Sequence, residues 1–230
     1  LGVMKNMQAT LSPSFNLDQS NQQYQTSIIG HKPTVLTRIY DDNISACIQT
    51  RTLGKDITDY ATFICNSHSN IELSLIITPT SIAEQLSHAL PHHDTRAVFI
   101  HDVVTIIDMF ACLFDLEKIG LRLTTLTKAM CPRFHTDHVP CRLITTYLGK
   151  GTEWLDSNPI DPCQLNTYND PHDNIPFFEE APFLQLKAGD IALFKGDRWE
   201  ESTASRGVIH RSPQLNPGAV RLLLTLDMIR

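Results

Sequence analysis

The sequence predicts an α+β protein in which helices come first and an antiparallel β unit follows. From about residue 33 to 118, apolar residues recur at helical spacing. From about residue 120, the apolar runs become short and β-branched, and glycine, proline and asparagine separate them. We therefore expect three parts: a polar, mobile tail at 1–30, a helical region at 31–118, and a β core at 119–230.

The composition is ordinary for a soluble globular protein, with 42% hydrophobic and 19% charged residues. A formal charge of −6 without a basic stripe argues against nucleic acid as a partner. No apolar run approaches the roughly 20 residues that span a bilayer, so we expect no membrane partner. Six cysteines without a CxxC pair, and a start without a signal-peptide pattern, indicate a reduced, cytoplasmic protein. Nothing in the sequence indicates an oligomeric state.

The first half contains three helical patterns of different strength. The strongest covers 95–118, and a shorter one starts near Ser81; the pattern over 43–66 is weaker. One face of the strongest helix is apolar, and its residues are Val103, Ile106, Ile107, Phe110, Leu113 and Phe114.

The second half contains four predicted strands, LRLTTLT, CRLITTYLG, GDIALFKG and AVRLLLTLDM. Between 156 and 183 lies a proline-rich segment, and connections of this length are usually functional or disordered.

The stretch FHTDHVP, residues 134–140, precedes the second strand and carries His135 and Asp137. Residues two apart in a strand point the same way, so these two side chains can share a metal ion. A third ligand must come from a distant strand, and His210 in RGVIHRSP is the candidate. Two imidazoles and one carboxylate form the facial triad suited to Fe(II), which leaves coordination positions open. A buried hydrogen-bonded network is the alternative interpretation of the three residues.

Arg221 follows His210 by eleven residues, and the turn-forming SPQLNPGA between them predicts a hairpin. Arg221 would then point into the same cavity, where its guanidinium matches a carboxylate with two parallel hydrogen bonds. A structural ion pair with Asp227 or Glu153 is the alternative. His138 is expected to point away from the site, toward solvent or a supporting partner.

The motifs LRLTTLTKAMCPRFHTDHVPCRLITTYLGKGTEWL and KGDRWE…GVIHRSP…RLLLTLD resemble a bacterial family called domain of unknown function 1826, over roughly residues 95–230. The order HxD…H…R over 120–230 is also similar to the Fe(II)/2-oxoglutarate dioxygenases, with the phytanoyl-CoA-hydroxylase-like branch nearest in spacing. This second resemblance implies a double-stranded β-helix, a jelly-roll or cupin-like barrel, in 119–230.

The same resemblance implies that His135, Asp137 and His210 form the catalytic metal site and bind Fe(II). It also implies that Arg221 binds the distal carboxylate of 2-oxoglutarate. Many of these enzymes have Ser or Thr two residues after that arginine, where this chain has Leu223. Tyr147 and Arg142, from the strand after HxD, are the expected replacements.

The expected function is hydroxylation of an unidentified small molecule, with Glu153 and Trp154 lining the substrate site. For those two residues the alternatives are a strand cap and a packing anchor. A non-enzymatic zinc protein of metal homeostasis is the alternative function, because a Cys131 thiolate beside the same residues would suit Zn(II).

Overall fold

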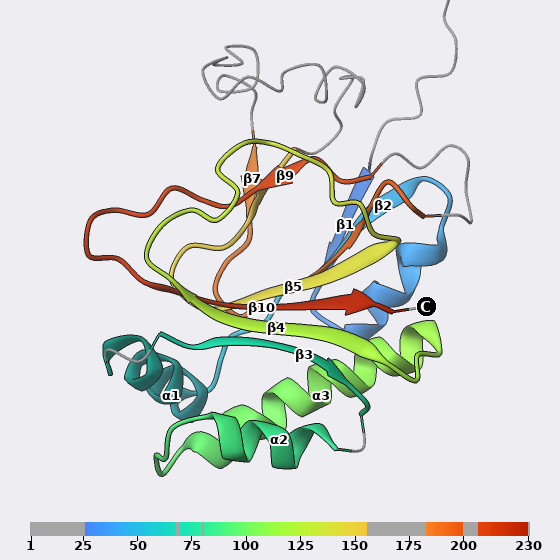
Figure 1. Ribbon diagram of the computed structural model, residues 1–230. Helices are drawn as coiled ribbons and strands as arrows, with labels where there is room; N and C mark the ends of the chain where they lie inside the picture. The colour runs from blue at the N-terminus through green and yellow to red at the C-terminus, as the bar shows by residue number, and fades with distance from the viewer. Residues whose placement is uncertain (1–25, 68–69, 80, 156–182, 200–206, 230) are drawn as a thin grey trace, which may run out of the picture.

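A seven-stranded sheet forms the centre of the fold (Figure 1), in the order β1-β2-β8-β5-β10-β4-β3. The computed structural model describes residues 26–67, 70–79, 81–155, 183–199 and 207–229. The strands of this sheet are β1 Thr26–Gly30, β2 Ile44–Gln49, β3 Glu72–Ile77, β4 Ile119–Leu126, β5 Cys141–Leu148, β8 Ile191–Lys195 and β10 Arg221–Met228. Apart from the parallel pair β1–β2, neighbouring strands are antiparallel.

Helices cover one face of this sheet, and a small second sheet lies on the other (Figure 1). The helices are the 3₁₀ helix η1 Pro33–Tyr40 and the α-helices α1 Lys55–Asn66, α2 Ile82–Ala89 and α3 Arg96–Phe114. The small sheet has the order β7-β6-β9, with β7 Leu184–Gln185, β6 Glu153–Trp154 and β9 His210–Arg211.

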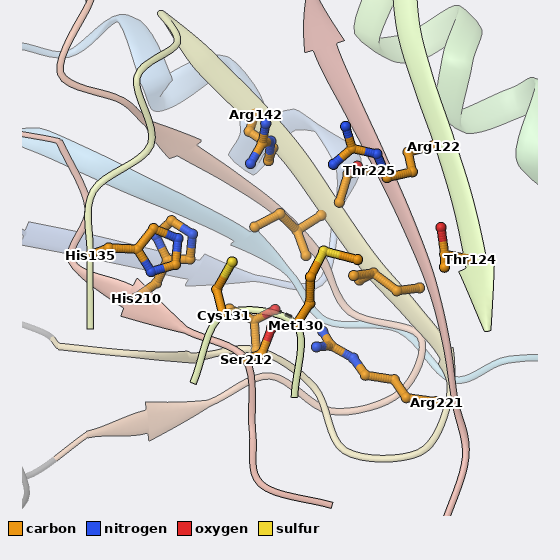
Figure 2. Close-up of a pocket in the computed structure, with 13 residues that line it drawn as sticks. Arg122, Thr124, Met130, Cys131, His135, Arg142, His210, Ser212, Arg221 and Thr225 are labelled. Carbon is orange, nitrogen blue, oxygen red and sulfur yellow. Dashed lines mark hydrogen bonds between the residues drawn. The ribbon is translucent and has the colours of Figure 1, made fainter. Parts of the chain in front are cut away.

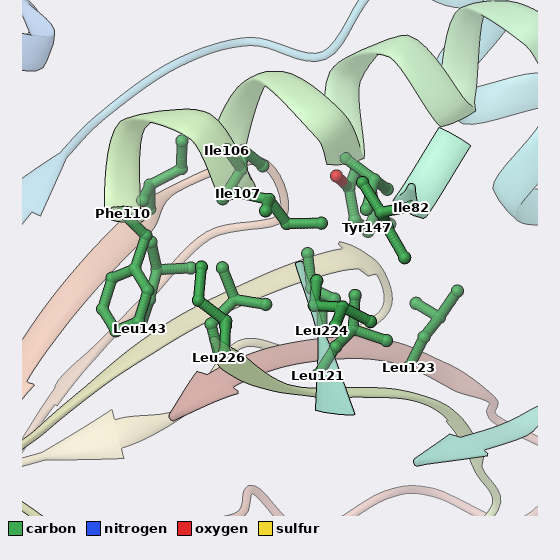
Figure 3. Close-up of a cluster of buried hydrophobic side chains, with 14 of the residues drawn as sticks. Ile82, Ile106, Ile107, Phe110, Leu121, Leu123, Leu143, Tyr147, Leu224 and Leu226 are labelled. Atoms are coloured by element: carbon green, nitrogen blue, oxygen red, sulfur yellow. The ribbon is translucent and has the colours of Figure 1, made fainter. Parts of the chain in front are cut away.

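The main hydrophobic core lies between the large sheet and α3 (Figure 3). Side chains alternate along β4 and β10, so every second residue faces the helix. Leu121, Leu123 and Leu224 are at most 2% exposed there. By length and composition α3 is apolar enough to cross a membrane, but Phe99 and Phe110 are buried against the sheet, as in the core helix of a globular fold.

A second, smaller apolar cluster lies between the two sheets. Its members come from both sheets, and they include Ile48, Ile144, Trp154, Leu186, Phe194 and Val208. This cluster fixes the small sheet, and with it β9, at a defined height above the large one.

The predicted α+β class is confirmed in its coarse form, and α2, α3, β4, β5, β8 and β10 fall where the sequence predicts them. The helical region at 31–118 differs from expectation because it also contains β2 and β3. Within the weak helical pattern over 43–66, the run ISACIQ is a wholly buried strand. A short apolar run fits a buried strand and a buried helix equally well, which explains the error.

Two other expectations concern the ends of described segments. Thr26–Gly30 of the expected tail forms β1 beside β2, whereas residues 1–25 lie outside the described residues. The proline-rich stretch 156–182 lies outside them as well. The five cysteines in the described part of the chain are free thiols.

Candidate metal centre and anion pocket

The three predicted metal ligands come together in the fold. One potential ligand atom from each of His135, Asp137 and His210 lies within 4.8 Å of the others. Nε2 of His135 is 3.6 Å from Asp137 Oδ1, and Nε2 of His210 is 3.3 Å from Asp137 Oδ2. An antiparallel bridge joins the two histidines, whose backbones exchange hydrogen bonds of 3.0 and 2.9 Å. The bridge explains how residues 75 positions apart meet.

Both imidazole rings are held by the backbone just before them. Nδ1 of His135 lies 2.9 Å from the carbonyl oxygen of Arg133, and Nδ1 of His210 lies 3.0 Å from that of Val208. A carbonyl oxygen can only accept, so each Nδ1 carries the proton and donates it. Each Nε2 is thereby left as a lone-pair donor facing Asp137, which is the arrangement of metal-ligating histidines.

Asp137 is held as a carboxylate. Burial alone would raise its pKa, but His135 and His210 can hydrogen-bond to it through Nε2 when their rings are doubly protonated, and these bonds and the charge of Arg142 outweigh burial and lower the pKa. Arg142 Nη1 lies 2.8 Å from Asp137 Oδ2, and the rest of its fork binds Asp227. Oδ2 is buried and accepts no well-formed hydrogen bond from the described residues. A buried, ionised oxygen without such a bond fits a metal ligand.

The loop that carries Asp137 is fixed by the backbone of residues 196–198. The N–H groups of Gly196, Asp197 and Arg198 donate to the carbonyls of Pro140, Asp137 and Val139. A Cβ on Gly196 would lie 1.9 Å from the Val139 oxygen, so no other residue fits there. The motif KGD contains this glycine, but nothing in the neighbouring sequence indicates that another loop packs on it. His138 points away and contacts the Asp197 carboxylate at 2.9 Å, as expected.

Arg221 is 1% exposed and has no carboxylate partner within the described residues. Its Nε and Nη2 donate to the Thr146 hydroxyl, and Nη2 also donates to Thr152 at 2.8 Å. Burial lowers its pKa to about 10, with only a partial opposing effect of Glu153. The alternative of a structural ion pair is wrong, because Asp227 pairs with Arg142 and Glu153 with Arg211.

A pocket of about 60 Å³ connects the histidines with Arg221 (Figure 2). Strands β4, β5 and β10 form its floor, and residues 130–135 lie over it. The Arg221 guanidinium points from β10 into this space, and His135 and His210 line its opposite side (Figure 2). Volume on this scale holds several water molecules or part of a small ligand.

Of the two residues expected to support Arg221, Arg142 does line the pocket, where it binds Asp137 and Asp227, but the expectation for Tyr147 is wrong. Tyr147 lies on the helix-covered face, where its hydroxyl donates to Asp102 and its ring packs on Phe99. Arg142 and Tyr147 are five residues apart, an odd number, so one strand cannot present both on one face. Thr146, on the pocket face, makes the contact instead.

The predicted hairpin between His210 and Arg221 does not form. β9 pairs with β6 in the small sheet, and β10 pairs with β4 and β5 in the large one. The two residues nevertheless line one pocket, because the sheets face each other across it.

The predicted substrate residues Glu153 and Trp154 are buried in β6 and do not line the pocket. Glu153 accepts hydrogen bonds from Arg211 and Gln185, and Trp154 packs near Phe194. Glu153 is therefore an ion-pair partner of Arg211 within the fold, and Trp154 is a packing anchor. Cys131 is exposed and lines the pocket, but its sulfur is not part of the ligand cluster.

Comparison with known proteins gives no match among curated proteins. Among solved structures, the chain is similar to the dioxygenase for auxin oxidation 1 from Arabidopsis thaliana in its binary complex with 2-oxoglutarate. Identity is 10%, the TM-score is 0.49, and the match covers 89% of this chain and 92% of that one.

Two further similar structures are a Pseudomonas putida prolyl-4-hydroxylase and the Fe(II)/α-ketoglutarate-dependent dioxygenase TqaL. The first has 10% identity, a TM-score of 0.44, and coverage of 86% of this chain and 98% of that one. The second has 12% identity, a TM-score of 0.48, and coverage of 86% of both chains. The model of the family described as "Protein of unknown function (DUF1826)" matches residues 30–227, and the chain belongs to this family.

Proposed function

We propose that this protein is a non-haem Fe(II)- and 2-oxoglutarate-dependent oxygenase acting on a small molecule, with its two sheets forming a double-stranded β-helix. The observation that carries the proposal is the buried guanidinium of Arg221, which has no carboxylate partner among the described residues and lies in the same pocket as His135 and His210. A buried cation without a counter-ion is costly, and an anionic ligand removes that cost.

The residues present fit an iron site. His135, Asp137 and His210 would hold Fe(II) through two Nε2 atoms and one carboxylate, and three protein ligands leave positions open. Bound iron would supply oxygen activation. Arg142 keeps the Asp137 carboxylate ionised and in place. A closed zinc site requires a fourth protein ligand, and among the described residues the cluster contains three.

The Arg221 end of the pocket would bind the distal carboxylate of 2-oxoglutarate. Nη1 of Arg221 donates to none of the described groups, so it is available to a ligand. The hydroxyls of Thr146 and Thr152 fix the guanidinium plane. Thr146 in β5 and Thr152 in the following turn thus provide hydroxyl groups beside Arg221, which the apolar side chain of Leu223 does not.

The turn between β5 and β6 is built to bring Thr152 to Arg221. Gly149 has a φ of +89°, a left-handed conformation that favours glycine. At Gly151 a Cβ would lie 2.1 Å from the Leu186 oxygen, so the backbones pack directly against each other. Both glycines are therefore part of the predicted anion site.

Calorimetry on metal-free protein tests the proposal, with anaerobic Fe(II) added first and 2-oxoglutarate second. We expect 2-oxoglutarate to bind only after the metal. Arg221→Met should weaken the oxo acid about 10- to 100-fold, the value of a charge-assisted hydrogen bond, and leave iron affinity unchanged. Arg198→Met, which removes an exposed charge, is the matched control. Unchanged 2-oxoglutarate affinity in Arg221→Met would refute the assignment.

A further inference from the structure

Three arginines line the pocket, and one of them, Arg122, has no role in the proposed function. Arg122 lies on β4, opposite Thr225 of β10, and lines the pocket at its open side. Its side chain is exposed, and it makes no ion pair with a carboxylate in the part of the chain that the structure describes. Figure 2 shows Arg122 and Thr225 together at the end of the pocket away from Arg221.

The two neighbouring carboxylates on this face of the sheet, those of Asp227 and Glu72, form no ion pair with Arg122 within the described residues. Both oxygens of Asp227 accept from Arg142, at 2.6 and 2.9 Å. Glu72 of β3 is opposite Thr124, diagonal to Arg122, and forms no ion pair within the described residues. Across the described ranges, the Arg122 guanidinium therefore has donors without a carboxylate acceptor.

Two buried hydroxyls beside Arg122 also lack partners. Thr124 is 7% exposed and Thr225 is 8% exposed, and both line the pocket. Neither Oγ1 has a hydrogen-bond partner within the described residues. Buried polar atoms are nearly always satisfied, so two orphaned hydroxyls next to one cation point to a missing oxygen-rich ligand.

The anion site at Arg122 is distinct from the one at Arg221. In the β4–β10 register Arg122 is opposite Thr225, and Arg221 is opposite Leu126, four residues away. At about 3.3 Å per residue the two backbone positions are roughly 13 Å apart. The apolar side chains of Ile144 and Leu223 line the floor between them. One small diacid at Arg221 would leave the Arg122 end free.

We propose that the substrate is an organic acid whose oxyanion, a carboxylate or a phosphate, is bound by Arg122 and by the hydroxyls of Thr124 and Thr225. Its apolar body lies on Ile144 and Leu223, which brings it toward the histidines. The assignment of this ligand as the substrate rests on the proposed function. The anion site itself requires neither metal nor 2-oxoglutarate.

Ligand-observed NMR on the full chain tests the site, with benzoate, benzamide and phenyl phosphate as probes. Metal is left out, because a carboxylate would otherwise bind it directly. Benzoate and benzamide have almost the same shape and differ in charge. We expect benzoate or phenyl phosphate to bind at least about tenfold more tightly than benzamide, as one charge-assisted hydrogen bond requires. The tighter of the two acids identifies the oxyanion.

Matched variants locate the binding. Arg122→Gln should weaken the acids at least about tenfold, and Thr225→Val should weaken them by a smaller factor. The comparison is made in an Arg221→Met background, because the Arg221 site would otherwise bind the same acids; in that background Arg198→Gln should leave their binding unchanged. Thermal unfolding checks that each variant is folded. Acid binding that survives Arg122→Gln, or that is lost in Arg221→Met, would overturn the proposal, as would equal binding of benzamide.

The result of the NMR binding test does not depend on the result of the calorimetry. Failure of iron and 2-oxoglutarate binding would end the oxygenase proposal and leave the Arg122 site intact. Failure of benzoate and phenyl phosphate to bind would end the acid-substrate proposal and leave the oxygenase assignment intact.

Discussion

The two faces of β4, β5 and β10 differ sharply although the same strands build both. The face toward α3 carries Leu121, Leu123 and Leu224 and is closed by apolar packing. The opposite face carries Arg221 and Thr225, whose polar groups are incompletely satisfied. Alternation along a strand thus gives one face the apolar packing and the other face the side chains that line the pocket. We therefore expect polar side chains on the pocket face to lower the stability of the ligand-free protein and to raise its affinity for a ligand.

The largest effect is expected at the metal ligands. His210→Ala removes one of three ligands and should reduce Fe(II) affinity at least about 100-fold, because even residues that only support a ligand contribute 10- to 100-fold. His138→Ala removes an exposed histidine three residues from His135 and should leave affinity unchanged. Metal content after dialysis, measured by mass spectrometry, checks both. Equal metal loss in the two variants would contradict the site.

On the helix-covered face, Leu224→Ala should destabilise the protein by about 2–5 kcal/mol, because Leu224 is fully buried and a cavity would remain. Leu223 is the preceding residue on the same strand. Leu223→Ala should lower the free energy of unfolding by less, because Leu223 already borders the pocket. Urea unfolding measures both free energies. A larger loss for Leu223→Ala would reverse the assignment of the two faces.

On the pocket face, Arg221→Met should stabilise the ligand-free protein by roughly 1–4 kcal/mol, because it replaces a buried charge with an apolar side chain. Burial lowers the pKa of Arg221 to about 10, so at any pH below that the side chain is charged in the fold and the cost of burying its charge is fully present. Urea unfolding at neutral pH is the measurement. Destabilisation would show that Arg221 has a structural role and not a binding one.

The smallest effect is expected at the orphaned hydroxyl of Thr225. Thr225→Val keeps the shape and removes an unsatisfied group, so it should stabilise the free protein by about 1 kcal/mol. Thr146→Val, on the same face, should destabilise it, because the Thr146 hydroxyl accepts from Arg221. Thermal unfolding of the pair separates the two cases. Equal shifts in the same direction would contradict the distinction.

The sequence predicted the elements that have a long, clear period, and it also predicted that His135, Asp137 and His210 lie together. The two-residue spacing of His135 and Asp137 reflects a local geometry, and His210 follows from the need for a third ligand. Arg221 lies in the predicted pocket, but the hairpin from which that position was predicted does not form. Turn residues show that the chain reverses, and they do not specify which sheet the next strand joins.

The remaining features depend on contacts between distant segments. β6, β7 and β9 have two residues each, which is too short for any periodicity. Gly196 is required because another loop passes over it, and the sequence around it does not show this. The position of Thr146 follows from the strand period: it is four residues after Arg142 and therefore lies on the same face of β5. Tyr147 is five residues after Arg142 and lies on the opposite face.

An anaerobic titration followed by visible absorption tests most directly whether one pocket holds both the metal and the oxo acid. Fe(II) is added to metal-free protein, and 2-oxoglutarate is then added in steps. We predict a weak charge-transfer band that appears only after the oxo acid is added. It should be absent in His210→Ala and should need higher 2-oxoglutarate concentrations in Arg221→Met. No band in the wild-type protein, together with tight Zn(II) binding, would contradict this prediction and indicate a closed metal site.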